Sequence, residues 1–267
     1  MTTTETERRP SSYALGHTPE EYERLRGQAR VWEAATGRVL DQLGLPKSAS
    51  CLARRVGPGG RVLGIDADSS IGALAVEMLH GSGHHQCAFH AHDLTADEPV
   101  PGAPFDLVYA RLLLFHLPQR VAVLSRLWDA VAPGGHLVVQ DYDIRAISVL
   151  PDLASFSEVG RVITDAFGAA GADVYVGARL SHLFAQAGAG VPDGTDVSGR
   201  TEPFGTGHLF LETVFRSVLP AALAHGITTE DAAAAALAEF DRDATRFAFR
   251  PMLWPLLIGA WKRKERA

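Results

Sequence analysis

Between residues 61 and 140 the chain alternates short apolar runs with amphipathic segments. The runs are rich in Val, Leu, Ile and Phe and are bounded by turn residues or acids, which is typical of strands in a buried parallel sheet. They lie at residues 61–66, 86–92, 105–110 and 136–140. Segments 71–80 and 119–131 carry apolar residues at helical spacing. Strands and helices that alternate on short loops predict an α/β fold with a doubly wound, mostly parallel, Rossmann-like sheet over residues 47–143.

Helical patterns precede this core. Residues 13–46 predict an N-terminal helical cap, with one helix from Thr18 towards Arg30 and a second from Glu33 to Leu43. Residues 1–12 are polar and are expected to be a disordered tail without the apolar segment of a signal peptide.

Helical patterns also follow the core. Residues 144–250 predict a helical lid with an edge strand at 200–204, and Gly188–Gly199 predicts a loop. Residues 251–267 predict a basic tail after a final strand, Leu256–Trp261, which we expect to return antiparallel to the sheet edge. The lid helices are predicted near residues 156–169, 178–187, 209–225 and 229–246.

The entry into the sheet is irregular. Ser48–Leu52 begins like a strand but runs directly into Ala53–Val56, which has the pattern of a helix end. Only 14 positions separate Ser48 from Arg61 with both ends counted, whereas a strand–helix–strand crossover needs about 30 residues. The first strand is therefore expected to be truncated or absent.

Composition narrows the function. The formal net charge of −6 and the lack of a basic stripe beyond Lys262–Lys264 argue against nucleic-acid binding. No apolar run approaches the ~20 residues of a membrane span. Two cysteines, Cys51 and Cys87, offer neither a disulfide framework nor a CxxC site, which predicts a reducing cytoplasm.

Asp66 stands at the carboxyl end of the first complete strand. Open α/β sheets bind ligands at this rim, where a carboxylate can accept both hydroxyls of a ribose. The alternative is that Asp66 caps the helix that starts near Ser69.

Several short pieces occur in an order and spacing that resemble a class I S-adenosylmethionine-dependent methyltransferase of the small-molecule type. The resemblance spans about Tyr13 to Arg263. The pieces are Tyr13–Gly16, Glu23–Gln28, the strand with Asp66, Asp93-Leu94, Phe105–Arg111, Phe115–Pro118 and Ala132–Gly135.

The resemblance implies a binding site for S-adenosylmethionine. Asp66 would hold the ribose, and Asp93 would accept from the adenine amino group beside the backbone amide of Leu94. Arg111 would lie near the methionine part, and Gln28, with Tyr13, would cover the cofactor. The alternatives are a turn acid at Asp93, an exposed helix start at Arg111 and a surface position at Gln28.

The sequence departs from that family at its most diagnostic piece, the first strand with its acid and Gly-x-Gly loop. Cys51-Leu52 joins Ala53–Arg55 as if about a dozen residues were absent. Without this first strand, the sheet is expected either to divide into two poorly joined halves or to have Ser48–Leu52 in the position of the first strand. A natural deletion, an engineered deletion and an altered mode of cofactor binding are all consistent with this pattern.

Other candidate chemistry is limited. His116 follows a strand at the functional rim and is a candidate general base, and Asp141 and Asp143 could orient a substrate. No metal site is assigned, although His84, His85, Cys87, His90 and His92 are crowded together. The aromatic residues Phe204, Phe210, Phe215, Trp254 and Trp261 are either core or the wall of an acceptor pocket.

Two functions follow from these observations. The first is methyl transfer from S-adenosylmethionine to a small-molecule acceptor, with no nucleic-acid or membrane partner and with a homodimer as a plausible assembly. The second is a degenerate or repurposed relative that keeps the scaffold and the acceptor pocket but not the donor site.

Overall fold

The computed structural model describes residues 19–43 and 52–266. The predicted tail 1–12, Tyr13 and the strand-like Ser48–Cys51 lie outside the described residues.

The N-terminal helices agree with the prediction. Helix α1 spans Pro19–Val31 and α2 spans Glu33–Gln42. A short helix α3, Leu52–Val56, then leads into strand β1, Val62–Asp66. Helix α4 (Ser69–Gly81) and strand β2 (Cys87–Ala91) follow, and β2 pairs with β1 in parallel.

In the second part of the core, residues 105–143, strand β4 is longer than predicted. Strand β3 spans Phe105–Arg111, and the 3₁₀ turn η1 spans Leu114–His116. Helix α5 (Arg120–Asp129) leads into strand β4, Val131–Asp143, which starts five residues earlier than the apolar run at His136. The register of β3 and β4 shifts between Phe105 and Leu107, so the Pro-Gly-Gly turn is absorbed into the strand as an irregularity.

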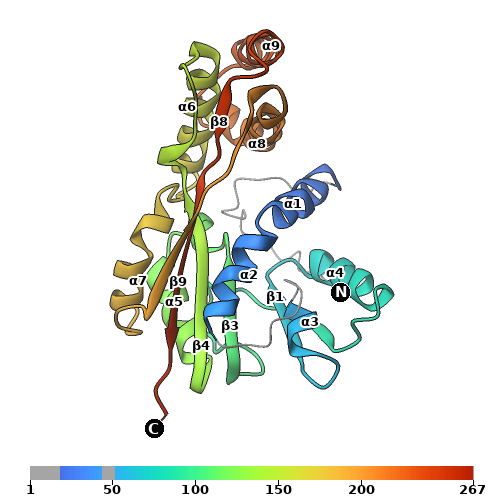
Figure 1. The fold of residues 1–267 in the computed structure, drawn as a ribbon, viewed down its shortest axis with the longest axis vertical. Coiled ribbons are helices and arrows are strands. Elements are labelled where there is room, and N and C mark those ends of the chain that lie inside the picture. The colour runs from blue at the N-terminus through green and yellow to red at the C-terminus, as the bar shows by residue number, and fades with distance from the viewer. Residues whose placement is uncertain (1–18, 44–51, 267) are drawn as a thin grey trace, which may run out of the picture.

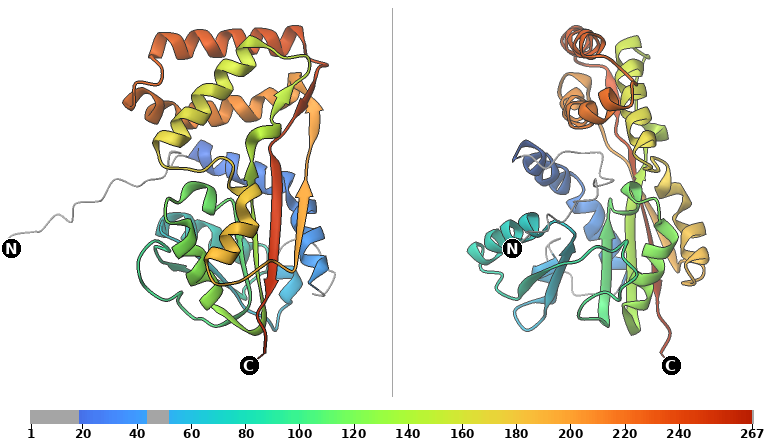
Figure 2. Two further views of the ribbon diagram at one scale, coloured as in Figure 1. Left: turned by 90° about the vertical axis from the view of Figure 1, so that its left-hand side faces the viewer. Right: turned by 180° about the vertical axis from the view of Figure 1, so that it is seen from behind.

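The region predicted to be a lid, called the lid region below, begins with the 3₁₀ turn η2 (Ile144–Ala146), the short strand β5 (Ser148–Val149) and helix α6 (Ala154–Ala169). The turn η3 (Val176–Arg179) and helix α7 (Leu180–Gln186) follow. Helices α8 (Phe204–Ala224) and α9 (Glu230–Arg246) pack with α6 beyond the carboxyl ends of β3 and β4, as Figures 1 and 2 show.

The C-terminal part differs from the prediction in three ways. The predicted loop Gly188–Gly199 contains a strand, β6 (Gly194–Ser198), and a strand β8 (Pro251–Leu253) was not expected. The last strand, β9 (Leu256–Arg263), is antiparallel as predicted but lies inside the sheet, between β4 and β6. Thr195 and Val197 alternate with polar residues, but the pattern is too short to stand out between glycines. Strand β7, Thr201–Pro203, agrees with the predicted edge strand.

The described strands form three separate sheets. Their orders are β1-β2, β3-β4-β9-β6 and β5-β8-β7. Helix α2 covers one face of the four-stranded sheet, and α5 and α7 lie on the other, so the sheet has helices on both faces (Figures 1 and 2). β1 and α4 stand beside this sheet, and among the described strands β1 pairs only with β2.

The other edge of β1 has no partner among the described strands, and the side chains of β1 are less buried than the sequence predicted. Val62, Leu63 and Ile65 are only half-buried, although their pattern predicted a fully buried strand. On α4, Leu74 and Met78 of the predicted apolar side remain 44% and 42% exposed. A pair of strands offers too little surface to cover an apolar helix, so this unit is weakly packed.

Side chains join the β1–β2 unit to the rest of the molecule. The Arg55 guanidinium on α3, with a side chain only 4% exposed, donates to Asp41 Oδ1 on α2 at 2.9 Å and to the Gly37 carbonyl at 3.2 Å. Arg126 on α5 donates to the Leu94 carbonyl at 3.1 Å. These contacts attach the β1–β2 unit to the larger sheet, as the backbone hydrogen bonds of a central strand would in a continuous sheet.

We predict that Asp41→Asn lowers the free energy of unfolding by about 1–3 kcal/mol, because the buried Arg55 guanidinium loses its charged partner. Urea denaturation measures the change. Asp97→Asn is the matched control, since Asp97 also pairs with an arginine but is fully exposed, and its loss should cost less than about 0.5 kcal/mol. Equal effects of the two substitutions would contradict the proposed role of Arg55.

Candidate functional site

One large cavity, of about 2410 Å³, lies between the β1–β2 unit, the open edge of β3 and the lid helices. Drug-sized ligand sites are usually about 300–1,000 Å³. All of β1 and all of β3 line the cavity. Its volume therefore includes the slot between the two sheets as well as the space at their carboxyl ends.

Asp66 lies at the carboxyl end of β1 and borders the cavity. It does not cap α4, because the N-cap of that helix is Asp68, whose carboxylate accepts from the N–H groups of Ser70 and Ile71. Asp66 Oδ1 accepts from the Asp68 N–H at 2.9 Å. Within the described residues its other oxygen makes no hydrogen bond, so it is available to a ligand hydroxyl.

Asp93 follows β2 and borders the same cavity, as does Leu94. Asp93 Oδ1 accepts from the Thr95 N–H at 2.8 Å and from the Thr95 hydroxyl at 2.7 Å. Asp93 therefore also stabilises the turn after β2, which was its alternative role. The hydrogen bond from the Thr95 hydroxyl is the main cause that holds the pKa of Asp93 below its usual value. The carboxylate is therefore charged at neutral pH, and its Oδ2 has no protein partner among the described residues.

Arg111, at the end of β3, is held from the side by α2. Its Nη1 donates to Thr36 Oγ1 at 3.0 Å, and that hydroxyl donates to Gln140 Oε1 at 2.8 Å. Tyr109 Oη also donates to Gln140 Oε1, at 3.0 Å. The next residue, Leu112, has φ of +53°, a conformation that costs a residue with a side chain about 1 kcal/mol or more and that concentrates at functional sites.

Gln28 of α1 borders the cavity, and together with the buried Trp32 it holds Tyr142, which also borders the cavity. The Tyr142 hydroxyl accepts from Trp32 Nε1 at 2.6 Å and from Gln28 Nε2 at 3.0 Å. Burial raises the pKa of Tyr142 to about 12, so the phenol stays neutral. Gln28 is thus a wall residue of the cavity, and its amide is engaged with the protein.

His116 lies in η1 and also borders the cavity. Its ring packs against Phe115 and Phe167, with centroid distances of 4.9 and 6.0 Å. Burial lowers the pKa of His116 to about 3. The imidazole is therefore neutral at pH 7, in a largely apolar setting.

Asp141 holds the turn that carries His116. Its carboxylate accepts from the N–H groups of Phe115 and Tyr142 at 3.1 and 3.0 Å, and it is fully buried and does not border the cavity. Burial raises the pKa of Asp141 to about 7, against the lowering effect of these N–H donors. Asp143 pairs with Arg145, so neither acid faces the cavity as a substrate ligand.

The lid end of the cavity is mostly apolar, although Asp152, Ser157 and Thr164 also line it. Phe210 of α8 lines it and stacks on Trp254, with ring centroids 4.3 Å apart, whereas Phe204 and Phe215 are core residues without exposed area. Apolar side chains of α6 and α8 complete this wall: Phe156, Ile163, Phe167, Leu211 and Val214.

The structure brings all the predicted site residues to the rim of one cavity: Gln28, Asp66, Asp93, Leu94, Arg111 and His116. Sequence reasoning missed two polar clusters, the network of Thr36, Tyr109 and Gln140 and the contacts of Tyr142 with Gln28 and Trp32. The one visible signal was Gln140 and Tyr142 at the end of the apolar run that follows His136. In the described residues the histidines near residue 90 do not form a group of three metal ligands.

None of the helices in the described ranges combines the length and the apolarity that a membrane crossing requires.

Residues 44–135 match the family model described as "Methyltransferase domain". Trans-aconitate 2-methyltransferase from Paracidovorax citrulli is 36% identical over 118 residues, which are 44% of this chain and 43% of that protein. The enzyme of the same name from Methylobacterium nodulans is 37% identical over 113 residues, 42% of this chain and 41% of that protein. The aligned part thus spans about two fifths of each of these curated relatives.

Among solved structures, a putative methyltransferase from Bacillus halodurans superposes with a TM-score of 0.49 at 14% identity. The superposition covers 77% of this chain and 83% of that one.

The opposite pKa shifts of Asp141 and His116 predict opposite effects of pH on stability. Asp141 holds a proton in the folded state up to about pH 7 but only up to 3.8 when exposed, so it adds stability as the pH falls. His116 is neutral down to about pH 3 when folded but gains a proton below 6.5 when unfolded, so it removes stability as the pH falls. The two contributions largely cancel between about pH 4.5 and 6.5.

We therefore expect Asp141→Asn to lose stability relative to the wild type on acidification, by up to about 1.4 kcal/mol per pH unit in that window. Urea denaturation at a series of pH values measures the difference. The control Asp97→Asn should run parallel to the wild type. A difference between Asp141→Asn and wild type that does not change with pH would show that Asp141 is ionised in the folded protein.

Proposed function

The chain belongs to the class I S-adenosylmethionine-dependent methyltransferase family, and we propose on this premise that it transfers a methyl group from S-adenosylmethionine to a small-molecule acceptor. The observation that supports the proposal best is the large cavity, which joins the carboxylates of Asp66 and Asp93 to a mostly apolar lid end. A nucleoside-containing donor and a small-molecule acceptor would meet at the border of these two regions.

The rim residues fit the donor chemically. Asp66 and Asp93 each keep one carboxylate oxygen without a protein partner in the described residues, and hydroxyl and amino groups of an adenosine are donors of the right kind. We assign the ribose to Asp66, the adenine edge to Asp93 and Leu94, and the methionine carboxylate to Arg111. Gln28 covers the site. When bound, the donor supplies an electrophilic methyl group on its sulfonium.

The protein's own part in the reaction is mainly positioning, which an in-line displacement requires. We propose that His116 is the catalytic side chain that contacts the acceptor. As a neutral imidazole it can accept a hydrogen bond from an acceptor hydroxyl and orient it. A pKa of about 3 makes it a weak base, so the acceptor proton leaves to solvent in the end.

The alternative function is a relative that no longer binds the donor and acts as a non-methylating enzyme or binding protein. The observation that favours it is the edge of β1 that no described strand pairs with, because the first strand and its glycine loop are the usual backbone contacts of the cofactor. Loss of several such hydrogen bonds, at about 1 kcal/mol each, would remove much of the affinity.

We also propose a cytoplasmic location, from the two cysteines without a disulfide framework, and a homodimer as the assembly to be tested. The two trans-aconitate enzymes suggest small organic acids as the first acceptors to screen.

Calorimetric titration with S-adenosylmethionine and with S-adenosylhomocysteine tests the donor site. We expect micromolar binding, and Asp66→Ala should weaken it by about 10–100-fold, because one charge-assisted contact is lost. Asp97→Ala is the matched control, since this exposed acid does not border the cavity. An acceptor screen with isotope-labelled donor then measures methyl transfer.

Absence of donor binding in a protein that unfolds cooperatively would reject methyl transfer and support the alternative. If the donor binds equally well to Asp66→Ala and to the wild type, methyl transfer remains the proposed function but Asp66 is not the ribose ligand.

A further inference from the structure

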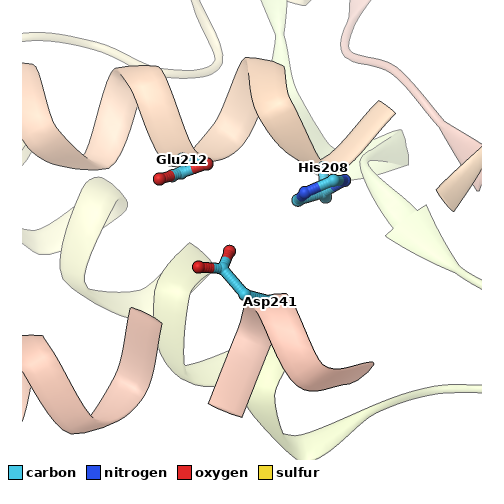
Figure 3. A group of neighbouring side chains, drawn as sticks. All are labelled: His208, Glu212 and Asp241. Atoms are coloured by element: carbon cyan, nitrogen blue, oxygen red, sulfur yellow. The ribbon is translucent and has the colours of Figure 1, made fainter. Parts of the chain in front are cut away.

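Helices α8 and α9 bring three potential metal ligands together away from the cavity. His208 and Glu212 lie four positions apart on α8, so they project from one face of that helix towards Asp241 on α9, as Figure 3 shows. One ligand atom of each residue lies within 4.8 Å of the other two. In the parts of the chain that the structure describes, no other His, Cys, Asp and Glu side chains meet this criterion.

The imidazole of His208 is fixed in an orientation that suits a ligand. Its Nδ1 lies 3.1 Å from the Phe204 carbonyl oxygen, which can only accept, so Nδ1 carries the proton. The lone pair is then on Nε2. The ring packs against Phe204 and Phe240, both fully buried, with centroid distances of 6.0 Å to each. A metal-bound histidine typically shows this arrangement, with its second nitrogen donating to a backbone carbonyl.

The two carboxylates are also accessible for coordination. The Asp241 carboxylate is on the exposed side of α9 and makes no hydrogen bond or ion pair with the described residues. Glu212 Oε1 accepts from Arg216 Nε at 2.9 Å and Nη2 at 2.6 Å, which orients the carboxylate. Its Oε2 is left for a second partner.

We infer that His208, Glu212 and Asp241 form a binding site for a divalent transition-metal ion such as Zn²⁺. One imidazole nitrogen and two carboxylate oxygens suit Zn²⁺, whereas Ca²⁺ and Mg²⁺ prefer oxygen donors alone. An ion placed among the three atoms lies within roughly 2.8 Å of each, and movements of about 0.7 Å reach the usual 2.0–2.2 Å bonds. Water would take the fourth position.

The ion would connect two helices of the lid. α8 contributes Phe210, Leu211 and Val214 to the cavity wall, and α9 packs against α8 from outside. Metal binding would therefore stabilise the lid without touching the rim residues Asp66 and Asp93. The inference does not depend on the proposed methyl transfer.

Zinc titration of the untagged full-length protein, after treatment with chelator, tests the site by calorimetry and by thermal melting. We expect one site per chain and a rise in melting temperature. His208→Gln and Glu212→Gln should each weaken binding at least tenfold. Arg216→Gln should strengthen it several-fold, because it removes a cation next to a metal ligand.

The double variant His84→Gln/His85→Gln is the matched control, since these histidines belong to the other histidine-rich segment of the chain. It should bind zinc like the wild type. Absence of a stoichiometric zinc site, or a site lost in the double variant and kept in His208→Gln, would overturn the inference. Melting curves in chelator, expected to be the same for Glu212→Gln and wild type, separate loss of the site from loss of folding.

Discussion

One edge of β1 and one edge of β3 have no partner among the described strands, and the rest of the structure depends on this constraint. Backbone groups on such edges normally pair with a neighbouring strand, and here the described strands leave both edges facing one cavity. The β1–β2 unit is therefore held by helices and by a few long side chains, of which the buried Arg55 is the most enclosed. Its half-buried strands and exposed apolar helix residues follow from the same cause.

Strand β4, in contrast, is paired along both of its edges. It pairs with β3 on one side and β9 on the other, and almost all of its second half is buried. Three consecutive residues of this strand connect separate parts of the molecule: Gln140 contacts α2 and β3, Asp141 holds the turn with His116, and Tyr142 holds the N-terminal helices. One rigid strand thus positions most of the far wall of the cavity.

The sequence allowed much of this to be predicted. Strands β1 to β3 and most helices follow from apolar periodicity and caps, and the rim residues follow from their positions after strands. Strand β6 was missed because five residues between glycines carry little pattern, and the inner position of β9 depends on β6. The network of Thr36, Tyr109 and Gln140 was missed because single polar residues do not show their tertiary partners. Asp241 was missed as a partner of His208 for the same reason, since only the packing of α9 on α8 joins them.

The division of the sheet also has a consequence for ligand binding. Asp66 and Asp93 belong to the weakly attached β1–β2 unit, whereas Arg111 and Tyr142 belong to the large sheet. A donor that contacts both groups would link the two sheets, which no described strand joins. Part of its binding free energy would then be used to fix the position of one unit against the other, and only the remainder would appear as affinity. In a continuous sheet, backbone hydrogen bonds fix the relative position of the two parts before the ligand binds. The same contacts would therefore give weaker binding here, together with a larger gain in stability of the β1–β2 unit when the ligand is bound.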